Sequence, residues 1–123
     1  MSQAKATQFE IRRYVPTDHD AVWELHNEVL NDAGAHAGNG PWDDDLHDIE
    51  DVYLNADGEF LVGTLHGDIV AMGAYKRSSS KSAEIKRMRV KTAFQRRGFG
   101  QRVLDDLQGR AMAAGYTLLH LDT

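Results

Sequence analysis

Apolar residues near the N-terminus alternate with polar ones. Phe9 and Ile11 occupy alternate positions, with Arg13 continuing the same face, which is the period of a β-strand with one buried side. Pro16 ends this pattern, because proline cannot donate a backbone hydrogen bond to a neighbouring strand. The sequence therefore predicts a first strand over residues 8–15.

The next two segments carry apolar residues three and four positions apart, the spacing of one helical face. Thr17 with Asp20 three residues later resembles a capping box, so a first helix is predicted from Thr17 to about Ala33. After a glycine-rich loop, a second, acidic helix is predicted over Asp43–Leu54. The positions predicted to face inward are Val22, Leu25 and Val29 in the first helix and Leu46, Ile49 and Val52 or Tyr53 in the second.

The C-terminal half predicts three strands, a helix and a last strand. Gly67-Asp68 is a typical hairpin signal between the first two of these strands. The order β-α-α-β-β-β-α-β indicates an α/β (α+β) fold with a mixed sheet flanked by helices, and the strands on either side of the last helix should be parallel. The predicted elements are strands Glu59–His66, Ile69–Arg77 and Ala83–Lys91, a helix from about Gly98 to Ala114, and a strand over Tyr116–Asp122.

Composition points to a soluble protein with a single domain over residues 1–123. Hydrophobic residues make up 41% and charged residues 27% of the chain, which is ordinary for a globular domain. The sequence contains neither a run of apolar residues long enough for a membrane helix nor a secretory signal, so we expect a cytoplasmic location without membrane contact. Cysteine is absent, which excludes disulfides and thiol catalysis.

Charge is unevenly distributed along the chain. The net charge is −5, yet residues 86–97 contain six basic residues and no acidic one. Residues 43–51 contain six acidic residues and neither lysine nor arginine. One basic window in an acidic protein predicts a local binding site for an anionic ligand rather than a track for nucleic acid.

A short glycine-containing segment, Gln95–Gly100, lies between a predicted strand and a predicted helix. Glycine at positions 98 and 100 allows close approach of a ligand and positive φ angles. The free N–H groups and the dipole of the following helix favour an anion such as a pyrophosphate. Neither the dinucleotide fingerprint nor the P-loop motif is present. Considered alone, the two glycines would serve equally well as a tight turn before a helix.

The segment Gln95–Gly100 also matches the Q/R-x-x-G-x-G/A signature, so the chain resembles the GNAT superfamily of acetyl-CoA-dependent N-acetyltransferases. Glu84–Val90 resembles the fourth strand of that family and Gly115–Thr123 the fifth. The order of elements agrees over residues 8–123, and residues 83–122 carry the specific likeness. The helix and strands that usually follow the fifth strand lie beyond Thr123, so the domain is expected to be C-terminally incomplete.

The resemblance implies a coenzyme site. Backbone groups of residues 88–90 would bond the pantetheine arm where the fourth and fifth strands diverge. The N–H groups of residues 96–101 would hold the pyrophosphate. Arg96, Arg97 or Arg102 could reach the remaining phosphate, although each could instead be a solvated charge at the start of the helix. The predicted cofactor-binding residues are Met88, Arg89, Val90, Gln95, Arg96, Arg97, Gly98, Phe99, Gly100 and Gln101.

The same resemblance implies the catalytic groups. Glu84, eleven residues before the motif glutamine, occupies the position where some members carry a general base. On an inner strand its pKa should be raised by desolvation, as a base near neutral pH requires. Glu84 could instead pair with Lys86 or Arg77 in a structural role. A backbone N–H near Val90 would stabilise the thioester oxygen. The family's usual proton donor, a tyrosine after the fifth strand, is not in this sequence, and only Tyr75 or Tyr116 could replace it.

Other features give weaker predictions. The histidines show no metal-binding motif, so no metal site is expected. The acidic stretch 43–51 could attract a cationic amine, or could simply favour a helix N-terminus. The apolar last strand would leave an edge open for a homodimer, unless this chain is a fragment of a longer protein.

The function predicted from these features is transfer of an acetyl group from acetyl-CoA to a primary amine of a small molecule or protein, by direct attack in a ternary complex. The alternative is an acyl-CoA-binding sensor or inactive fragment without transfer activity. RNA binding through residues 86–97 is a third possibility, but Phe94 and Phe99 are the only aromatic residues near that patch.

Overall fold

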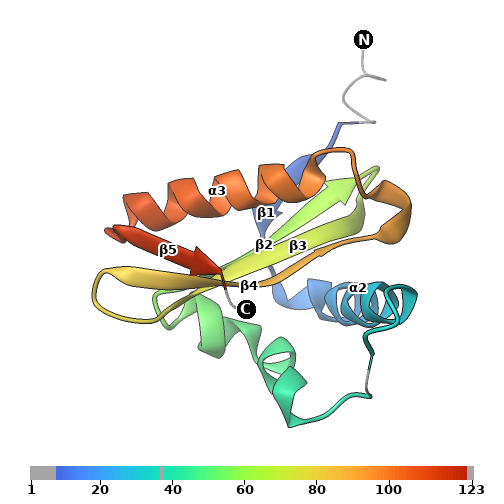
Figure 1. Cartoon of the computed structure of the whole chain (residues 1–123), viewed down its shortest axis with the longest axis horizontal. Coiled ribbons are helices and arrows are strands. Elements are labelled where there is room, and N and C mark those ends of the chain that lie inside the picture. The colour runs from blue at the N-terminus through green and yellow to red at the C-terminus, as the bar shows by residue number, and fades with distance from the viewer. Residues whose placement is uncertain (1–7, 37, 122–123) are drawn as a thin grey trace.

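A computed structural model describes residues 8–36 and 38–121. A five-stranded sheet with the order β1-β2-β3-β4-β5 runs through its centre (Figure 1). All neighbouring strands are antiparallel except β4 and β5, which are parallel. The predicted mixed sheet is therefore confirmed. The elements are β1 Glu10–Arg13, 3₁₀ helix η1 Pro16–Asp18, α2 His19–Asp32, 3₁₀ helix η2 Pro41–His47, π-helical turn η3 Glu50–Leu54, β2 Glu59–Leu65, β3 Asp68–Arg77, β4 Ser82–Val90, 3₁₀ helix η4 Thr92–Phe94, α3 Phe99–Ala113 and β5 Leu118–Leu121.

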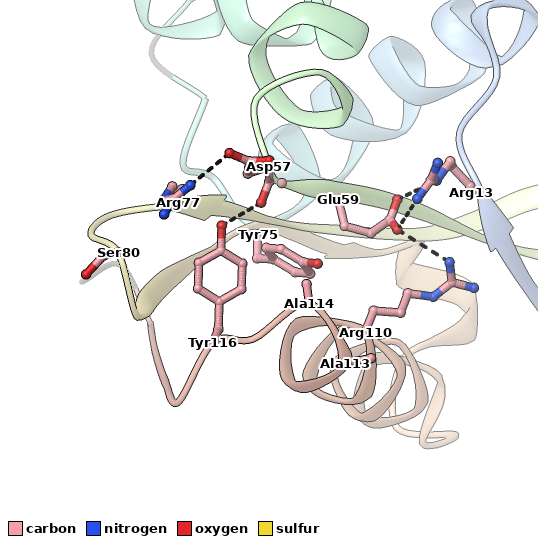
Figure 2. Close-up of a pocket in the computed structure, with 11 residues that line it drawn as sticks. Arg13, Asp57, Glu59, Tyr75, Arg77, Ser80, Arg110, Ala113, Ala114 and Tyr116 are labelled. Atoms are coloured by element: carbon pink, nitrogen blue, oxygen red, sulfur yellow. Dashed lines mark hydrogen bonds and ion pairs between the residues drawn. The ribbon is translucent and has the colours of Figure 1, made fainter.

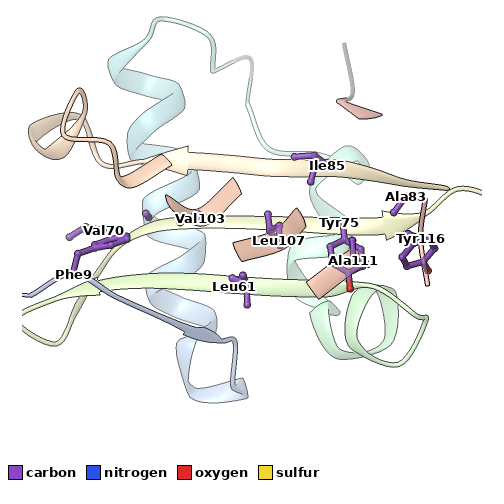
Figure 3. Close-up of a cluster of buried hydrophobic side chains, with 11 residues drawn as sticks. Phe9, Leu61, Val70, Tyr75, Ala83, Ile85, Val103, Leu107, Ala111 and Tyr116 are labelled. Atoms are coloured by element: carbon purple, nitrogen blue, oxygen red, sulfur yellow. The ribbon is translucent and has the colours of Figure 1, made fainter. Parts of the chain in front are cut away.

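The sheet separates two apolar cores. Helix α3 covers one face, while α2, η2 and η3 cover the other (Figure 1). On the α3 face, Val103 and Leu107 are fully buried against the strands (Figure 3). On the α2 face, Val22 and Leu25 pack against the opposite sides of the same strands. Each such side chain contributes roughly 1.5–3 kcal/mol by leaving water. The predicted inward positions Val22 and Leu25 of the first helix are thus confirmed.

The segment predicted as one α-helix over Asp43–Leu54 is not one helix. It forms η2 and η3, separated by Asp48, whose φ of −147° and ψ of 43° are not helical. Leu46, Ile49 and Tyr53 are nevertheless buried as predicted. Two of the aspartates, Asp43 and Asp45, turn inward to polar partners, and this requirement overrides the α-helical period.

The turn between β2 and β3 lies one residue earlier than predicted. Leu65 pairs with Asp68, so the two-residue loop is His66-Gly67, with φ angles of 55° and 84°. Two consecutive positive φ angles characterise the type I′ hairpin turn, which matches the twist of the strands. Asp68 therefore begins β3 instead of sitting in the turn.

The start of α2 also differs from the prediction. Asp18, at the end of η1, accepts a hydrogen bond from the backbone N–H of Val15 (2.9 Å), so the chain is held by Asp18 and not by a Thr17–Asp20 capping box. Arg12 locks the same carboxylate with two hydrogen bonds of 2.7 and 2.9 Å. The arginine lies six residues upstream on β1, which is a tertiary contact that no capping rule anticipates.

A β-bulge in β4 sets the geometry of the site described below. Ala74 pairs with Lys86 and Met72 with Arg89, so two residues of β4 oppose the single residue Gly73. The bulged residue Arg87 has a φ of 60°. An extra residue reverses the alternation of side chains beyond it. Ile85 and Met88 consequently face α3, whereas Arg87 and Arg89 face α2 and η2.

Strands β4 and β5 stay paired over only part of β4. The parallel pairing joins Ser82–Ile85 to Leu118–Leu121. Within the described part of the chain, residues 86–90 of β4 have no β5 partner on that edge. The predicted divergence of the two strands beyond this pairing stays a prediction.

Candidate coenzyme and acceptor site

The loop between β4 and α3 presents a row of backbone N–H groups. Gly98 has a φ of 81° and precedes the first residue of α3, and Arg96 has a φ of 65°. The first helical hydrogen bond runs from Arg102 N to Gly98 O (3.1 Å). None of the described residues accepts a hydrogen bond from the N–H groups of residues 96–101. Together with the helix dipole, these donors form a site suited to an anion.

Contacts on either side hold this loop in place. Gln95 donates its side-chain amide to the carbonyl of Val90 (2.9 Å). Thr92 donates its hydroxyl to Asp32 at the end of α2 (2.7 Å), and Lys91 N bonds Val70 O (2.8 Å). The side chain of the motif glutamine therefore braces the loop against β4. A direct contact between Gln95 and the coenzyme stays a prediction.

The three arginines considered for the remaining phosphate differ in their contacts. Arg102 stacks its guanidinium over the Phe9 ring (4.9 Å to the centroid) and donates to Phe9 O (3.2 Å). Arg97 lies over Phe94 at 5.3 Å, and Arg96 is exposed. Arg102 is thus engaged in packing β1 against α3, which leaves Arg96 and Arg97 as the candidates.

An apolar cleft of about 390 Å³ connects this loop to the open part of β4. Five predicted cofactor-binding residues line it, which brings together residues from the strand, the loop and the helix. The opposite wall comes from α2 and was missed by sequence reasoning, because only Val29 belonged to the predicted inward stripe. The lining residues are Val29, Leu30, Ala33, Met88, Arg89, Val90, Gln95 and Gly100.

A second groove, of about 570 Å³, continues along β4 towards β5. Met88 and Arg89 line both spaces, so the cleft and the groove meet at these two residues. Trp42 from η2 and Leu121 from β5 form its outer walls. A coenzyme arm in the cleft and an acceptor in the groove would therefore meet beside Met88 and Arg89.

Glu84, the predicted base, lies on the α2 face at the beginning of β4. Its side chain is 26% exposed and lies 3.8 Å from Lys86 Nζ. Of the two structural partners considered, Arg77 is excluded because it pairs with Asp57 (2.8 Å). Glu84 is therefore less deeply buried than an inner strand position implied, since only the short strand β5 shields it on that side. Its role as base stays a prediction.

Two aspartates of the acidic stretch, the buried Asp43 and the half-buried Asp45, are held in polar contacts. Asp43 accepts hydrogen bonds from His26 Nε2 (3.0 Å) and Asn39 (3.1 Å). Asp45 accepts from Arg87 (2.9 Å) and from the Tyr53 hydroxyl (2.6 Å). These carboxylates are thus committed to protein partners and do not form a free anionic wall.

The pKa shifts of this cluster fix its charges. Burial lowers the pKa of His26, so the imidazole is neutral. Its Nε2 carries the hydrogen atom and donates the hydrogen bond to Asp43. Although burial opposes ionisation of Asp43, hydrogen bonds from Asn39 and His26 hold its pKa below the ordinary value. Burial likewise opposes ionisation of Asp45, and the hydrogen bonds from Arg87 and Tyr53 outweigh it. Both aspartates are therefore anions at neutral pH.

Arg89 differs from its neighbour Arg87. Arg87 bonds Asp45 and donates to the carbonyl of Trp42 (2.6 Å). Arg89 donates only to Met88 O (2.9 Å), and its buried Nε has no partner among the described residues. Burial, followed by the positive charge of Arg87, lowers the pKa of Arg89. An unpaired buried donor costs roughly 1–3 kcal/mol and calls for an explanation.

Neither tyrosine considered as a proton donor lines the cleft or the groove. Tyr75 and Tyr116 belong to the α3-side core and border a separate pocket of about 480 Å³ with Arg13, Glu59 and Arg110 (Figure 2). The Tyr116 hydroxyl donates to Asp57 O (2.7 Å).

Within the described residues there is also no group of three or more potential metal ligands.

Comparison with known proteins agrees with this geometry. The model of the acetyltransferase (GNAT) family matches residues 19–123, so the chain belongs to that family. No curated protein sequence matches it significantly. No helix within the described ranges is long and apolar enough to cross a membrane.

Solved structures show the same fold. A GNAT-family acetyltransferase from Staphylococcus aureus Mu50 has a TM-score of 0.88 at 20% identity, covering 94% of this chain and 74% of the other. An acetyltransferase from Streptococcus agalactiae has a TM-score of 0.84 at 24% identity over 94% and 73%. A predicted acetyltransferase from Clostridium acetobutylicum, solved with acetyl-CoA, has a TM-score of 0.77 at 16% identity over 94% and 81%.

Proposed function

We propose that this protein transfers the acetyl group of acetyl-CoA to a primary amine of a small molecule or protein, by direct attack in a ternary complex. The observation that carries the proposal is the cleft joining the open edge of β4 to the unpaired N–H groups of residues 96–101. The Clostridium acetobutylicum relative of the same fold was solved with acetyl-CoA. The pyrophosphate would occupy the loop, and the pantetheine arm would lie along residues 88–90.

The chemistry needs an uncharged amine. A lysine-like amine has a pKa of about 10.4, so a base must remove a proton near neutral pH. Glu84 is the proposed base, and its partial exposure allows a water molecule to relay the proton. The amine nitrogen bonds the thioester carbon, the C–S bond breaks, and the coenzyme leaves as a thiolate. The nitrogen loses one further proton to water as it becomes an amide. A backbone N–H of β4 at Val90 or its neighbour would stabilise the oxyanion.

One observation favours the alternative of an acyl-CoA-binding sensor. Neither Tyr75 nor Tyr116 lines the groove, so no tyrosine among the described residues is placed to protonate the thiolate. Solvent would have to supply that proton in a transferase. Release of coenzyme A in the presence of a panel of amines separates a transferase from a sensor, because only a transferase consumes acetyl-CoA in step with acceptor.

The last strand supports a proposal about assembly. Strand β5 is the edge of the sheet, and Leu118 and Leu121 on it are 60% and 61% exposed. Exposed apolar edges favour pairing with another chain. We propose that two copies pair through β5, and sedimentation at several concentrations tests this.

The coenzyme placement is tested by calorimetry with acetyl-CoA. Gly100→Asp puts a negative charge at the proposed pyrophosphate position, while an acidic residue in the first turn of α3 is favourable for the helix itself. Gly109→Asp, at an open position of the same helix, is the matched control. We expect Gly100→Asp to weaken binding by about 100-fold or more, a loss typical of one repelled charge-assisted contact. Equal affinity in both variants would reject the placement.

A further inference from the structure

Arg89 lies at the centre of the site and has no carboxylate partner among the described residues. Its guanidinium lies where the cleft and the groove meet. One Nη donates to Met88 O, which fixes the plane of the group, while the buried Nε donates to none of the described residues. A planar guanidinium without a carboxylate partner is suited to a carboxylate or phosphate, which such a group can bind through two parallel hydrogen bonds.

The surrounding charges do not neutralise Arg89. The carboxylate whose charge acts on Arg89, Asp43, accepts hydrogen bonds from His26 and Asn39. Asp45 is held by Arg87, whose own positive charge acts on Arg89. No carboxylate of the described chain lies within 4.0 Å of the Arg89 guanidinium. The inner wall of the groove is therefore positive, although the sequence of η2 is strongly acidic.

We propose that Arg89 binds an anionic group of the acceptor, so that the preferred acceptor is an amine that also carries a carboxylate or a phosphate. This inference rests on the proposed transferase function and specifies its acceptor class. Anchoring the acid at Arg89 would place the amine in the groove next to the end of the coenzyme arm. Positive surroundings would also disfavour the ammonium form of that amine, which helps the attack.

The position of Arg89 separates this role from binding of the coenzyme phosphates. The N–H groups proposed for the pyrophosphate belong to residues 96–101 in the loop and the first turn of α3, of which Gly100 lines the cleft. Arg89 also lines the groove that ends at Trp42 and Leu121, which those loop residues do not. The ligand facing Arg89 is thus expected to enter from the groove.

The test compares matched acceptors with the wild-type protein, Arg89→Gln and Arg89→Lys. Each amino acid is paired with its carboxamide, and each aminoalkyl phosphate with the corresponding amino alcohol, so the two arms distinguish the two anions. The control is Arg77→Gln, at the end of β3, where Arg77 forms an exposed ion pair with Asp57. We expect Arg89→Gln to lower kcat/KM for the acidic acceptors of one arm by about 10- to 100-fold, mainly through KM, as loss of a charged hydrogen-bonded pair predicts. Arg89→Lys should retain part of that activity.

Three outcomes would overturn the proposal. An equal loss with acids and neutral partners would assign Arg89 to the thioester or to folding. A higher KM for acetyl-CoA alone would assign it to the coenzyme. A wild-type preference for neutral amines would reject an anionic acceptor directly.

If the wild type releases no coenzyme A with any amine, the proposed function fails. Calorimetry with acids and amides in the presence of coenzyme A still tests Arg89 in that case. Stronger binding of acids that disappears in Arg89→Gln would then support the anion site, and equal binding would reject it.

Discussion

The two faces of the sheet differ in whether a buried charged side chain has all of its hydrogen-bond partners within the protein. On the α3 face, the carboxylate of Glu59 is 3% exposed and accepts two hydrogen bonds from Arg13 (2.9 and 2.8 Å), with Arg110 at 3.4 Å and the Phe60 N–H at 3.1 Å (Figure 2). On the α2 face, Arg89 keeps a buried donor without a partner among the described residues. The polar atoms of the Glu59 carboxylate have protein partners, whereas the Arg89 Nε does not have one among the described residues.

This difference separates structural charges from charges available to a ligand. A carboxylate that already accepts four hydrogen bonds offers nothing to a ligand, whatever the size of the adjoining pocket. A guanidinium without a carboxylate partner among the described residues, which lines both the cleft and the groove, does offer an interaction. We therefore expect changes in the Glu59 cluster to alter stability and leave activity unchanged, and a change at Arg89 to alter activity.

The largest expected effect is on turnover, from Glu84→Gln on the α2 face. Loss of a general base typically slows the chemical step by about 10²–10⁴-fold. Affinity for acetyl-CoA should not change, because Glu84 lines neither the cleft nor the groove. The control is Glu10→Gln on the exposed edge strand β1. A pH–rate profile identical to that of the wild type would show that the proton leaves by another route.

The next effect is on stability and tests the difference between Arg87, which is paired with Asp45, and Arg89. Arg87→Met removes the partner of Asp45 and leaves that half-buried carboxylate with the Tyr53 hydroxyl alone. Breaking one side of a buried ion pair costs about 3 kcal/mol, which urea unfolding would detect. The double variant Arg87→Met with Asp45→Asn should recover part of the loss. A loss below about 1 kcal/mol would mean that the bulge is held by the backbone alone.

Glu59→Gln is the corresponding test on the α3 face. Arg13 and Arg110 are 59% and 37% exposed, so their charges return to water when the carboxylate is lost. We expect a smaller loss than at Arg87, about 1–2 kcal/mol, because only charge-assisted hydrogen bonds are weakened. The kcat/KM for acetyl-CoA should stay at the wild-type value. A large fall in kcat/KM without a loss of stability would contradict the assignment of this cluster to the framework.

The smallest effect concerns pH. Burial lowers the pKa of His26, so the unfolded chain takes up a proton near pH 6.5 that the folded chain refuses. The stability contributed by neutral His26 is therefore present above pH 6.5 and is lost as pH falls towards the lowered folded value, by at most about 1.4 kcal/mol per pH unit. Urea unfolding between about pH 7.5 and pH 5.5 measures this slope.

A non-titrating variant isolates the contribution of His26. His26→Gln keeps an N–H donor for Asp43 and should flatten the slope. His66→Asn, in the exposed β2–β3 turn, is the control, since asparagine tolerates the positive φ found there. An unchanged slope in His26→Gln would assign the pH dependence to other groups.

Periodicity predicted most of the fold correctly. Val22 and Leu25 of α2 are buried as predicted, because a helix on a sheet must place its apolar face inward. The error at Asp43–Leu54 arose where apolar spacing was right but side-chain polarity misled. The partners that hold Asp43 and Asp45 are His26, which donates a hydrogen bond, and Arg87, which forms an ion pair, and they lie 17 and 42 residues away.

The amino-acid sequence by itself determined the order of elements, the glycine-containing loop before α3 and the likeness to the GNAT family, because all of these depend on residues close together along the chain. Only the tertiary structure decided which arginine is free. Arg87 and Arg89 are two positions apart and would be equivalent on a regular strand. The bulge opposite Gly73 places both on the α2 face, and distant Asp45 then pairs with Arg87 alone. Whether a charge is satisfied depends on partners far away in sequence, which local pattern does not encode.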